Sequence, residues 1–179
     1  MRVSESELRR AVREIDAALA GTGWDQPARL YALVDTARLV SSEPGLAARL
    51  GLADDAPPDG YTAVEQDELP PDRALEDVLA SIEWPPEVDG CAAAVERVVL
   101  PPSAEEAMPE DPAELRTYAS HHPDRHEVRI VAAALRDGRA HCTLRIRGHG
   151  DGDLLEGADL GPGLVALISD TLKSGTGDT

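Results

Sequence analysis

Three histidines and an aspartate lie close together in the sequence, and their types and spacing could support metal chemistry. His121, His122 and His126 surround Asp124, and a zinc ion needs three or four such ligands that converge on one point. The spacing of His122 and His126 suits one face of a helix, but Pro123 disfavours a continuous helix there. We therefore predict solvated histidines at a helix end and no bound metal. A metal-assisted hydrolase that uses these four residues stays an alternative.

Neither cysteine is placed for covalent catalysis. Cys142 directly follows His141, and successive residues of a strand point to opposite faces, so this histidine cannot activate the thiol. Cys91 has no nearby base in the sequence, and the chain contains neither a Gly-x-Ser-x-Gly elbow nor a phosphate-binding glycine loop. We predict two buried, reduced thiols, no catalytic residue and no cofactor.

The net charge restricts the class of partner. Asp and Glu number 34 against 17 Lys and Arg, so the formal charge is -17 at pH 7. A field of this sign repels phosphate backbones and anionic membrane surfaces, which predicts no nucleic-acid and no membrane partner. As an alternative, rows of carboxylates could imitate a nucleic acid. No apolar run reaches the roughly 18 residues of a membrane span, and residues 1–7 lack an apolar signal core, so we expect a cytoplasmic protein.

The elements that would position these residues alternate between helices and strands. Apolar spacing predicts helices over residues 4–20, 75–82 and 161–173, two short helical pieces within 36–50, and strands over 29–34, 61–69, 90–100, 128–135 and 140–146. The second strand is polar at its far end, which predicts a place near an edge of the sheet. This order favours an α+β fold of two layers, with a mainly antiparallel sheet of about five strands packed against terminal and central helices.

The chain length of 179 residues predicts one domain, over 1–173. Residues 103–123 are expected to form an excursion from the core, and 174–179 a disordered tail. In the first helix, the apolar residues recur on one face and the polar ones are assigned to solvent. Those assigned to solvent are Arg9, Arg10, Arg13 and Asp16.

A hairpin over 127–147 carries the predicted interaction surface. Asp137 and Gly138 are typical of a two-residue type I′ turn. With that turn length, Ile130, Ala132 and Ala134 share a half-polar face of the hairpin, which needs a helix or a partner to cover it. We assign these three residues as an interaction surface.

Five segments together resemble a known family. They are 23–34 (GWDQPARLYALV), 64–70 (VEQDELP), 84–91 (WPPEVDGC), 122–129 (HPDRHEVR) and 159–164 (DLGPGL). The resemblance is to an uncharacterised family from high-GC Gram-positive bacteria, the actinobacteria, that has only a locus-tag name, and it covers nearly the whole chain. It implies no activity, cofactor or partner.

The size, charge and element order are also similar to those of the secretion-chaperone class, whose members dimerise and offer an apolar surface to a client. We therefore expect a non-enzymatic cytoplasmic interaction module, chaperone- or adaptor-like, that binds a polypeptide partner. Homodimerisation is left open by the sequence.

Overall fold

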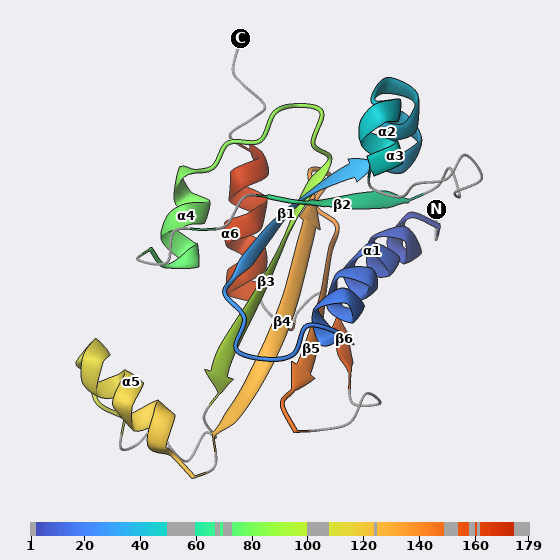
Figure 1. Cartoon of the computed structure of the whole chain (residues 1–179). Coiled ribbons are helices and arrows are strands. Elements are labelled where there is room, and N and C mark those ends of the chain that lie inside the picture. Colours follow the sequence, from blue (N-terminus) through green and yellow to red (C-terminus); the bar gives the residue numbers. More distant parts are fainter. Residues whose placement is uncertain are drawn as a thin grey trace.

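The structure is a computed structural model of the 179-residue chain, and it describes residues 3–49, 60–66, 69, 73–99, 108–123, 125–148, 154–157, 160 and 162–173. Its elements are α1 (Val3–Ala20), β1 (Arg29–Asp35), α2 (Thr36–Ser42), α3 (Pro44–Arg49), β2 (Tyr61–Glu65), α4 (Leu75–Ser81), β3 (Gly90–Val99), α5 (Pro112–His121), β4 (His126–Leu135), β5 (Ala140–Ile146), β6 (Leu155–Gly157) and α6 (Pro162–Lys173) (Figure 1).

The strands form one sheet in the order β2-β1-β3-β4-β5-β6, and every neighbouring pair is antiparallel. The predicted α+β class with an antiparallel sheet and terminal helices is therefore confirmed, as is the edge position of the second strand. Within the described ranges, the sheet has six strands rather than about five. The additional strand, β6, has only three residues, too few for a periodic pattern in the sequence.

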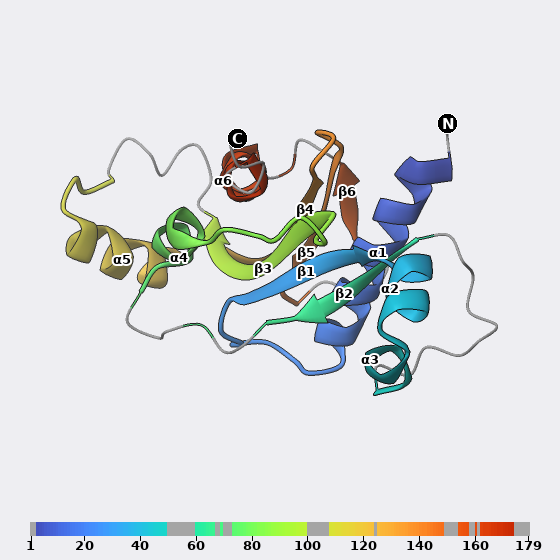
Figure 2. The same cartoon turned by 90° about the horizontal axis from the view of Figure 1, so that it is seen from above.

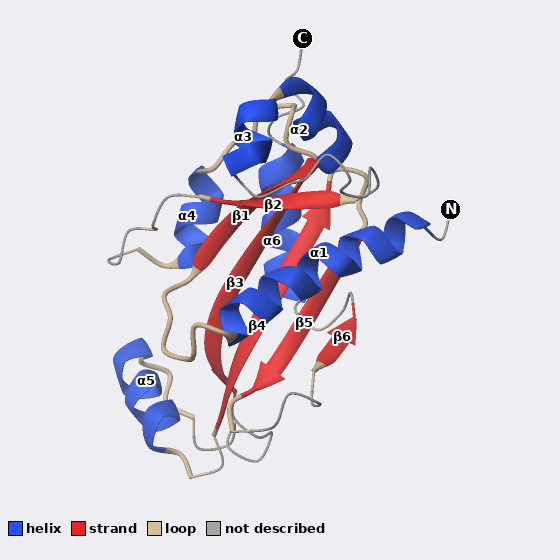
Figure 3. Ribbon diagram, turned by 45° about the vertical axis from the view of Figure 1, so that its right-hand side comes forward, coloured by secondary structure: helices blue, strands red, loops and turns tan. Residues whose placement is uncertain are grey.

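Helices cover both faces of the sheet. On one face, α1 lies across β2, β4 and β5 (Figure 3). On the other, α6 lies over β3 and β4 and packs against α4 (Figure 2). The fold thus has three layers, and the expectation of two layers is corrected. The physical reason is that the central strands are apolar on both sides: residues 91–95 of β3 are all buried, so each face needs its own cover.

The 127–147 hairpin turns where predicted, but its loop is one residue longer. Leu135 N donates to Arg139 O at 2.8 Å, and Gly138 N donates to Leu135 O at 3.0 Å, so the loop has the three residues 136–138. Gly138 has φ +94°, the left-handed conformation that such a loop requires at its last position. The register therefore differs by one residue from the predicted one, and it puts Ala132 opposite Cys142.

This register corrects the predicted interaction surface. Ala132 and Ala134 are 0% exposed and belong to the core cluster that includes Ile168 of α6, and the half-buried Ile130 packs against the same cluster. The one-residue shift places Ala140, Cys142 and Leu144 of β5 opposite these residues, so the face is apolar rather than half-polar. Here, α6 supplies the cover that the hairpin face was expected to need, so these residues cannot offer a free docking surface.

Two side chains fasten the α6 layer to the rest of the molecule. Trp84 Nε1 donates to Thr171 Oγ1 at 3.0 Å, and both residues are buried. Arg136, in the hairpin loop, donates to the carbonyl of Val88 at 2.7 Å and to that of Leu172 in α6. The hairpin loop, the segment before β3 and the end of α6 are thus held at one point.

Within the predicted excursion, the structure describes residues 108–123, which carry α5. This helix lies beyond the ends of β3 and β4, apart from the helices on the two faces (Figure 3). Residues 103–107 and the predicted tail at 174–179 fall outside the described residues.

Candidate functional site

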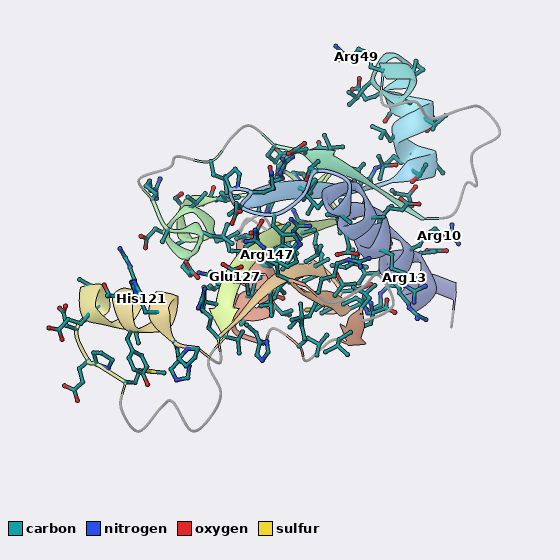
Figure 4. All side chains as sticks on the ribbon, turned by 60° about the horizontal axis from the view of Figure 1, so that its bottom comes forward. Arg10, Arg13, Arg49, His121, Glu127 and Arg147 are labelled. Atoms are coloured by element: carbon teal, nitrogen blue, oxygen red, sulfur yellow. The ribbon has the colours of Figure 1, made fainter. Side chains whose placement is uncertain are left out.

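The sides of α1 meet three different surroundings. The apolar side packs against the sheet and consists of Leu8, Val12, Ile15 and Leu19. One polar flank faces β5 and β6 and consists of Arg9, Arg13 and Asp16. The opposite flank consists of Glu7, Arg10, Glu14 and Ala18. Residues three or four apart share a flank of a helix, which is why the sequence sorts into these sets. Figure 4 shows Arg10 and Arg13 leaving the helix on different sides. One flank is held by ion pairs and the other borders a cleft.

Glu156 of β6 is the acceptor that holds the first flank. Its carboxylate receives Arg9 Nη2 at 2.9 Å and Arg13 Nε at 2.7 Å, and His141 Nε2 lies 3.2 Å from it. These hydrogen bonds, first those from Arg13 and Arg9, hold the pKa of Glu156 well below its usual range. The short strand β6 is thereby tied to α1 as well as to β5.

A second ion pair fixes the middle of α1. Arg145 Nε of β5 donates to Asp16 Oδ2 at 2.7 Å, and the Asp16 side chain is 1% exposed. The assignment of Asp16 to solvent is therefore wrong. The residue is polar in type but faces the sheet side of the helix, because a buried carboxylate is stable where a cation reaches it.

The opposite flank of α1 forms one wall of a cleft of about 490 Å³. We call it the α1–β2 cleft; its lining includes Arg10, Glu14 and Ala18 of α1, Tyr31 of β1, and Tyr61 and Ala63 of β2. Tyr31 is part of the core cluster beneath α1, and Tyr61 and Ala63 are partly buried against that cluster. The floor of the cleft is therefore made largely of ring and methyl carbon. Burial raises the pKa of both tyrosines, so their hydroxyls stay protonated and can donate hydrogen bonds at neutral pH.

The outer edge of β2 runs along this cleft. Thr36 N donates to Gly60 O, and Gln66 N donates to Leu30 O. In an antiparallel ladder, such bonded pairs alternate with pairs whose backbone groups point away from the neighbouring strand. The N–H and C=O groups of Tyr61, Ala63 and Glu65 consequently point away from β1. Since β2 ends the strand order of the described residues, these groups lie on the open edge of the sheet.

The charged groups of the cleft are partly paired. Arg29 Nη1 lies 2.8 Å from Glu65 Oε1 at one end. At the other end, the Arg10 guanidinium lies close to Gly60: a Cβ atom built on this glycine would be 3.9 Å from Arg10 Nη1. The described lining contains no histidine and no cysteine. Its carboxylates, guanidinium groups and tyrosine hydroxyls can bind and orient a ligand through hydrogen bonds.

The structure places the predicted metal residues apart from this cleft. His121 ends α5 and is exposed (Figure 4), and its Nδ1 lies 2.8 Å from Thr117 O. The His122 ring packs edge-on against Tyr118. His126 begins β4 and is exposed. Asp124 lies outside the described residues. Among the residues that the structure describes, no three or more His, Cys, Asp or Glu side chains gather as a metal site would require.

Both cysteines are buried and neither is in a disulfide, as predicted. Burial raises the pKa of Cys91 to about 12, so the nucleophilic thiolate is absent at neutral pH. Cys142 belongs to the core cluster on the α6 face, whereas His141 contacts Glu156 on the α1 side. The expected separation of this histidine from the neighbouring thiol is confirmed.

A family model matches a range of the chain that includes residues from both walls of the cleft. The model of the PPA1309-like protein family matches residues 8–173. The chain belongs to the PPA1309-like protein family. The predicted resemblance to a family with a locus-tag name is confirmed, and the bacterial group stays a prediction. No curated protein matches the chain, nor does any solved structure.

In this PPA1309-like chain, none of the helices in the described ranges has the length and apolar character needed to cross a bilayer. The matched range begins within α1 and ends at the last residue of α6, so residues 8–20 of α1 and the whole of β2 lie inside it.

The sequence analysis did not identify the α1–β2 cleft of this PPA1309-like chain. One signal for it was present: Glu7, Glu14 and Ala18 recur on one flank of α1, separate from Arg9 and Arg13. The floor could not be identified in this way, because tyrosines in a strand pattern indicate core packing as readily as a binding site.

Proposed function

We propose that this chain is a non-enzymatic polypeptide-binding module, chaperone- or adaptor-like, whose partner binds in the α1–β2 cleft. The observation that carries the proposal is the cleft of about 490 Å³ beside the open edge of β2. Its size lies within the range of about 300–1,000 Å³ of ligand sites, and it is wide enough for several side chains.

The chemistry of the cleft supports a protein partner. Tyr31 and Tyr61 offer ring carbon with a polar tip, a combination that is enriched in protein interfaces. Ala18 and Ala63 leave room above the floor. Arg10 and Glu14 stand at the exposed rim, where charged groups set specificity and orientation.

The net charge of the chain indicates what charge its polypeptide partner carries. At -17, the chain repels acidic proteins and attracts neutral or basic segments. Two buried cysteines outside any disulfide fit a reducing compartment, so the proposal keeps the predicted cytoplasmic location.

Two neighbouring alanines of α1 provide a matched experiment. Ala17 and Ala18 are both exposed, but only Ala18 lines the cleft. A photoreactive residue placed at Ala18 in the full chain should crosslink to a partner polypeptide in cells, whereas the same residue at Ala17 should not. Equal crosslinking from both positions, or none from Ala18, would contradict the proposal.

A blocking pair completes the test. Ala18→Trp should fill the cleft and prevent capture of the crosslinked partner, and Ala17→Trp should leave capture unchanged. Circular dichroism on both variants checks that α1 is intact. Capture that survives Ala18→Trp would place the binding surface elsewhere.

A further inference from the structure

Resting on the proposed function, we infer that the partner enters the α1–β2 cleft as an added strand, antiparallel to β2. The segment that binds is extended, has apolar side chains at alternate positions and carries a net positive charge. Strand addition at an open sheet edge is a general mode of peptide recognition, in which backbone hydrogen bonds give affinity and pockets for alternate side chains give specificity.

The backbone of β2 is arranged for this mode. The bonded pairs Gly60–Thr36 and Gln66–Leu30 leave Tyr61, Ala63 and Glu65 with their N–H and C=O groups turned outward. An extended segment laid along this edge could exchange hydrogen bonds with all three residues. The strand would become the seventh of the sheet, next to β2.

The same three residues line the cleft. In an antiparallel pair, residues that exchange backbone hydrogen bonds have their side chains on the same face of the sheet. The residues of the partner that bond to Tyr61, Ala63 and Glu65 therefore point their side chains into the cleft, over its apolar floor. The intervening residues point to the opposite face, which explains the alternating apolar pattern of the expected segment.

Charge selects the sign of the partner. Arg29 and Glu65 pair with each other at 2.8 Å, so the remaining charged residues of the described lining are Glu7, Glu14 and Arg10. Carboxylates are in excess there and over the whole chain, which carries -17. A basic segment is therefore favoured over an acidic one in its encounter with the chain as a whole.

The experiment uses a synthetic heptapeptide with valine at its second, fourth and sixth positions and with lysine and threonine alternating at the others. Binding to the isotope-labelled full chain is followed by NMR chemical-shift changes. One variant carries N-methyl groups on the three valine amides, and a matched variant carries them on the three amides that follow the valines. N-methylation removes a hydrogen-bond donor, so the two variants lose donors on opposite edges of the same strand.

We expect the unmodified peptide to shift the signals of β2 and of the Ala18 flank of α1. Methylation of the valine amides should weaken binding roughly tenfold or more, because the hydrogen bonds to β2 are lost. Methylation of the other amides should leave the affinity within about twofold of the unmodified peptide. Glutamate in place of each lysine should also weaken binding.

Several results would overturn the inference. They are equal loss from both methylation patterns, the reverse preference, shifts centred away from β2, or no binding by the unmodified peptide. If Ala18 crosslinks to a partner in cells and the methylation pattern has no effect, the proposed function stands and strand addition falls. A stable homodimer joined through β2, detected by light scattering and by shifts at its edge, would mean that a second copy occupies this edge instead.

Discussion

The Asp16 carboxylate of α1 and the Arg145 guanidinium of β5 form an ion pair at 2.7 Å in which the carboxylate is 1% exposed. Removing one partner of a buried pair leaves the other without compensation and typically costs about 3–5 kcal/mol. Arg145 keeps some contact with water, so we expect Asp16→Ala to lower the free energy of unfolding by about 2–3 kcal/mol. Urea denaturation measures this.

The control for that substitution is the exposed pair of Arg97 and Glu76, whose side chains are each 44% exposed. Glu76→Ala should change the free energy of unfolding by less than about 1 kcal/mol. If the two substitutions had equal effects, the pair beneath α1 would not anchor the helix, and the wall of the α1–β2 cleft would depend on apolar packing alone.

Thr143 offers a stabilising substitution. It is 0% exposed, and among the described residues its Oγ1 has no hydrogen-bond partner. Because an unpaired buried hydroxyl costs free energy, Thr143→Val should raise the free energy of unfolding by about 1 kcal/mol. Thr171 is the matched case: its buried hydroxyl accepts from Trp84 and donates to Ile168 O, so Thr171→Val should lower stability by about 1–2 kcal/mol. Loss of stability in both variants would show that the Thr143 hydroxyl is satisfied in solution.

Glu156 makes part of the stability depend on pH. Arg13, Arg9 and His141 hold its pKa below the ordinary value of 4.5, so the folded state favours the ionised carboxylate. Its contribution is complete above that ordinary value and is lost as the pH falls from there toward the depressed pKa. Glu156→Gln should therefore lower the free energy of unfolding by about 1–2 kcal/mol at pH 7.

The difference between this variant and the parent chain should shrink as the pH is lowered below 4.5. Denaturation series at several pH values measure it. A difference that stays constant down to low pH would mean that the glutamine disturbs packing rather than charge.

Gly90 marks a close approach of β3 to β4. A Cβ at this position would lie 2.6 Å from Ala134 O and 2.6 Å from Leu135 Cδ2. The backbone oxygen cannot move without disturbing the ladder, so Gly90→Ala should destabilise the fold by about 1–3 kcal/mol. Gly163 in α6 has open space around it, and Gly163→Ala should stabilise by about 0.5 kcal/mol through helix propensity. Thermal denaturation of both variants should show shifts of opposite sign.

Some features of this chain could be predicted from the sequence because they depend on neighbours in the chain. The apolar face of α1, the position of the hairpin at Asp137 and Gly138, and the edge position of the strand that begins at Tyr61 all follow from local periodicity and turn chemistry. Burial of Cys91 and Cys142 follows in the same way, since each lies within an apolar strand pattern.

The length of the hairpin loop was decided by tertiary structure. Sequence alone favoured a two-residue turn, whereas Arg136 also belongs to the loop and donates to the carbonyls of Val88 and Leu172. These acceptors come from segments far away in the chain. With a side-chain period of two, the one extra residue decides which residues of β5 share a face with Ala132, and it places Cys142 opposite Ala132 on the face that α6 covers.

The α1–β2 cleft was likewise beyond the sequence. Periodicity shows which residues of α1 are polar, but not which polar flank meets another element and which is left open. Asp16 is buried because Arg145, 129 positions further on, reaches it from β5. The opposite flank borders a cleft because β2 and β1 continue the sheet beyond the helix on that side. Local sequence determines the elements and their apolar faces, whereas contacts between distant segments determine which of the remaining faces are covered.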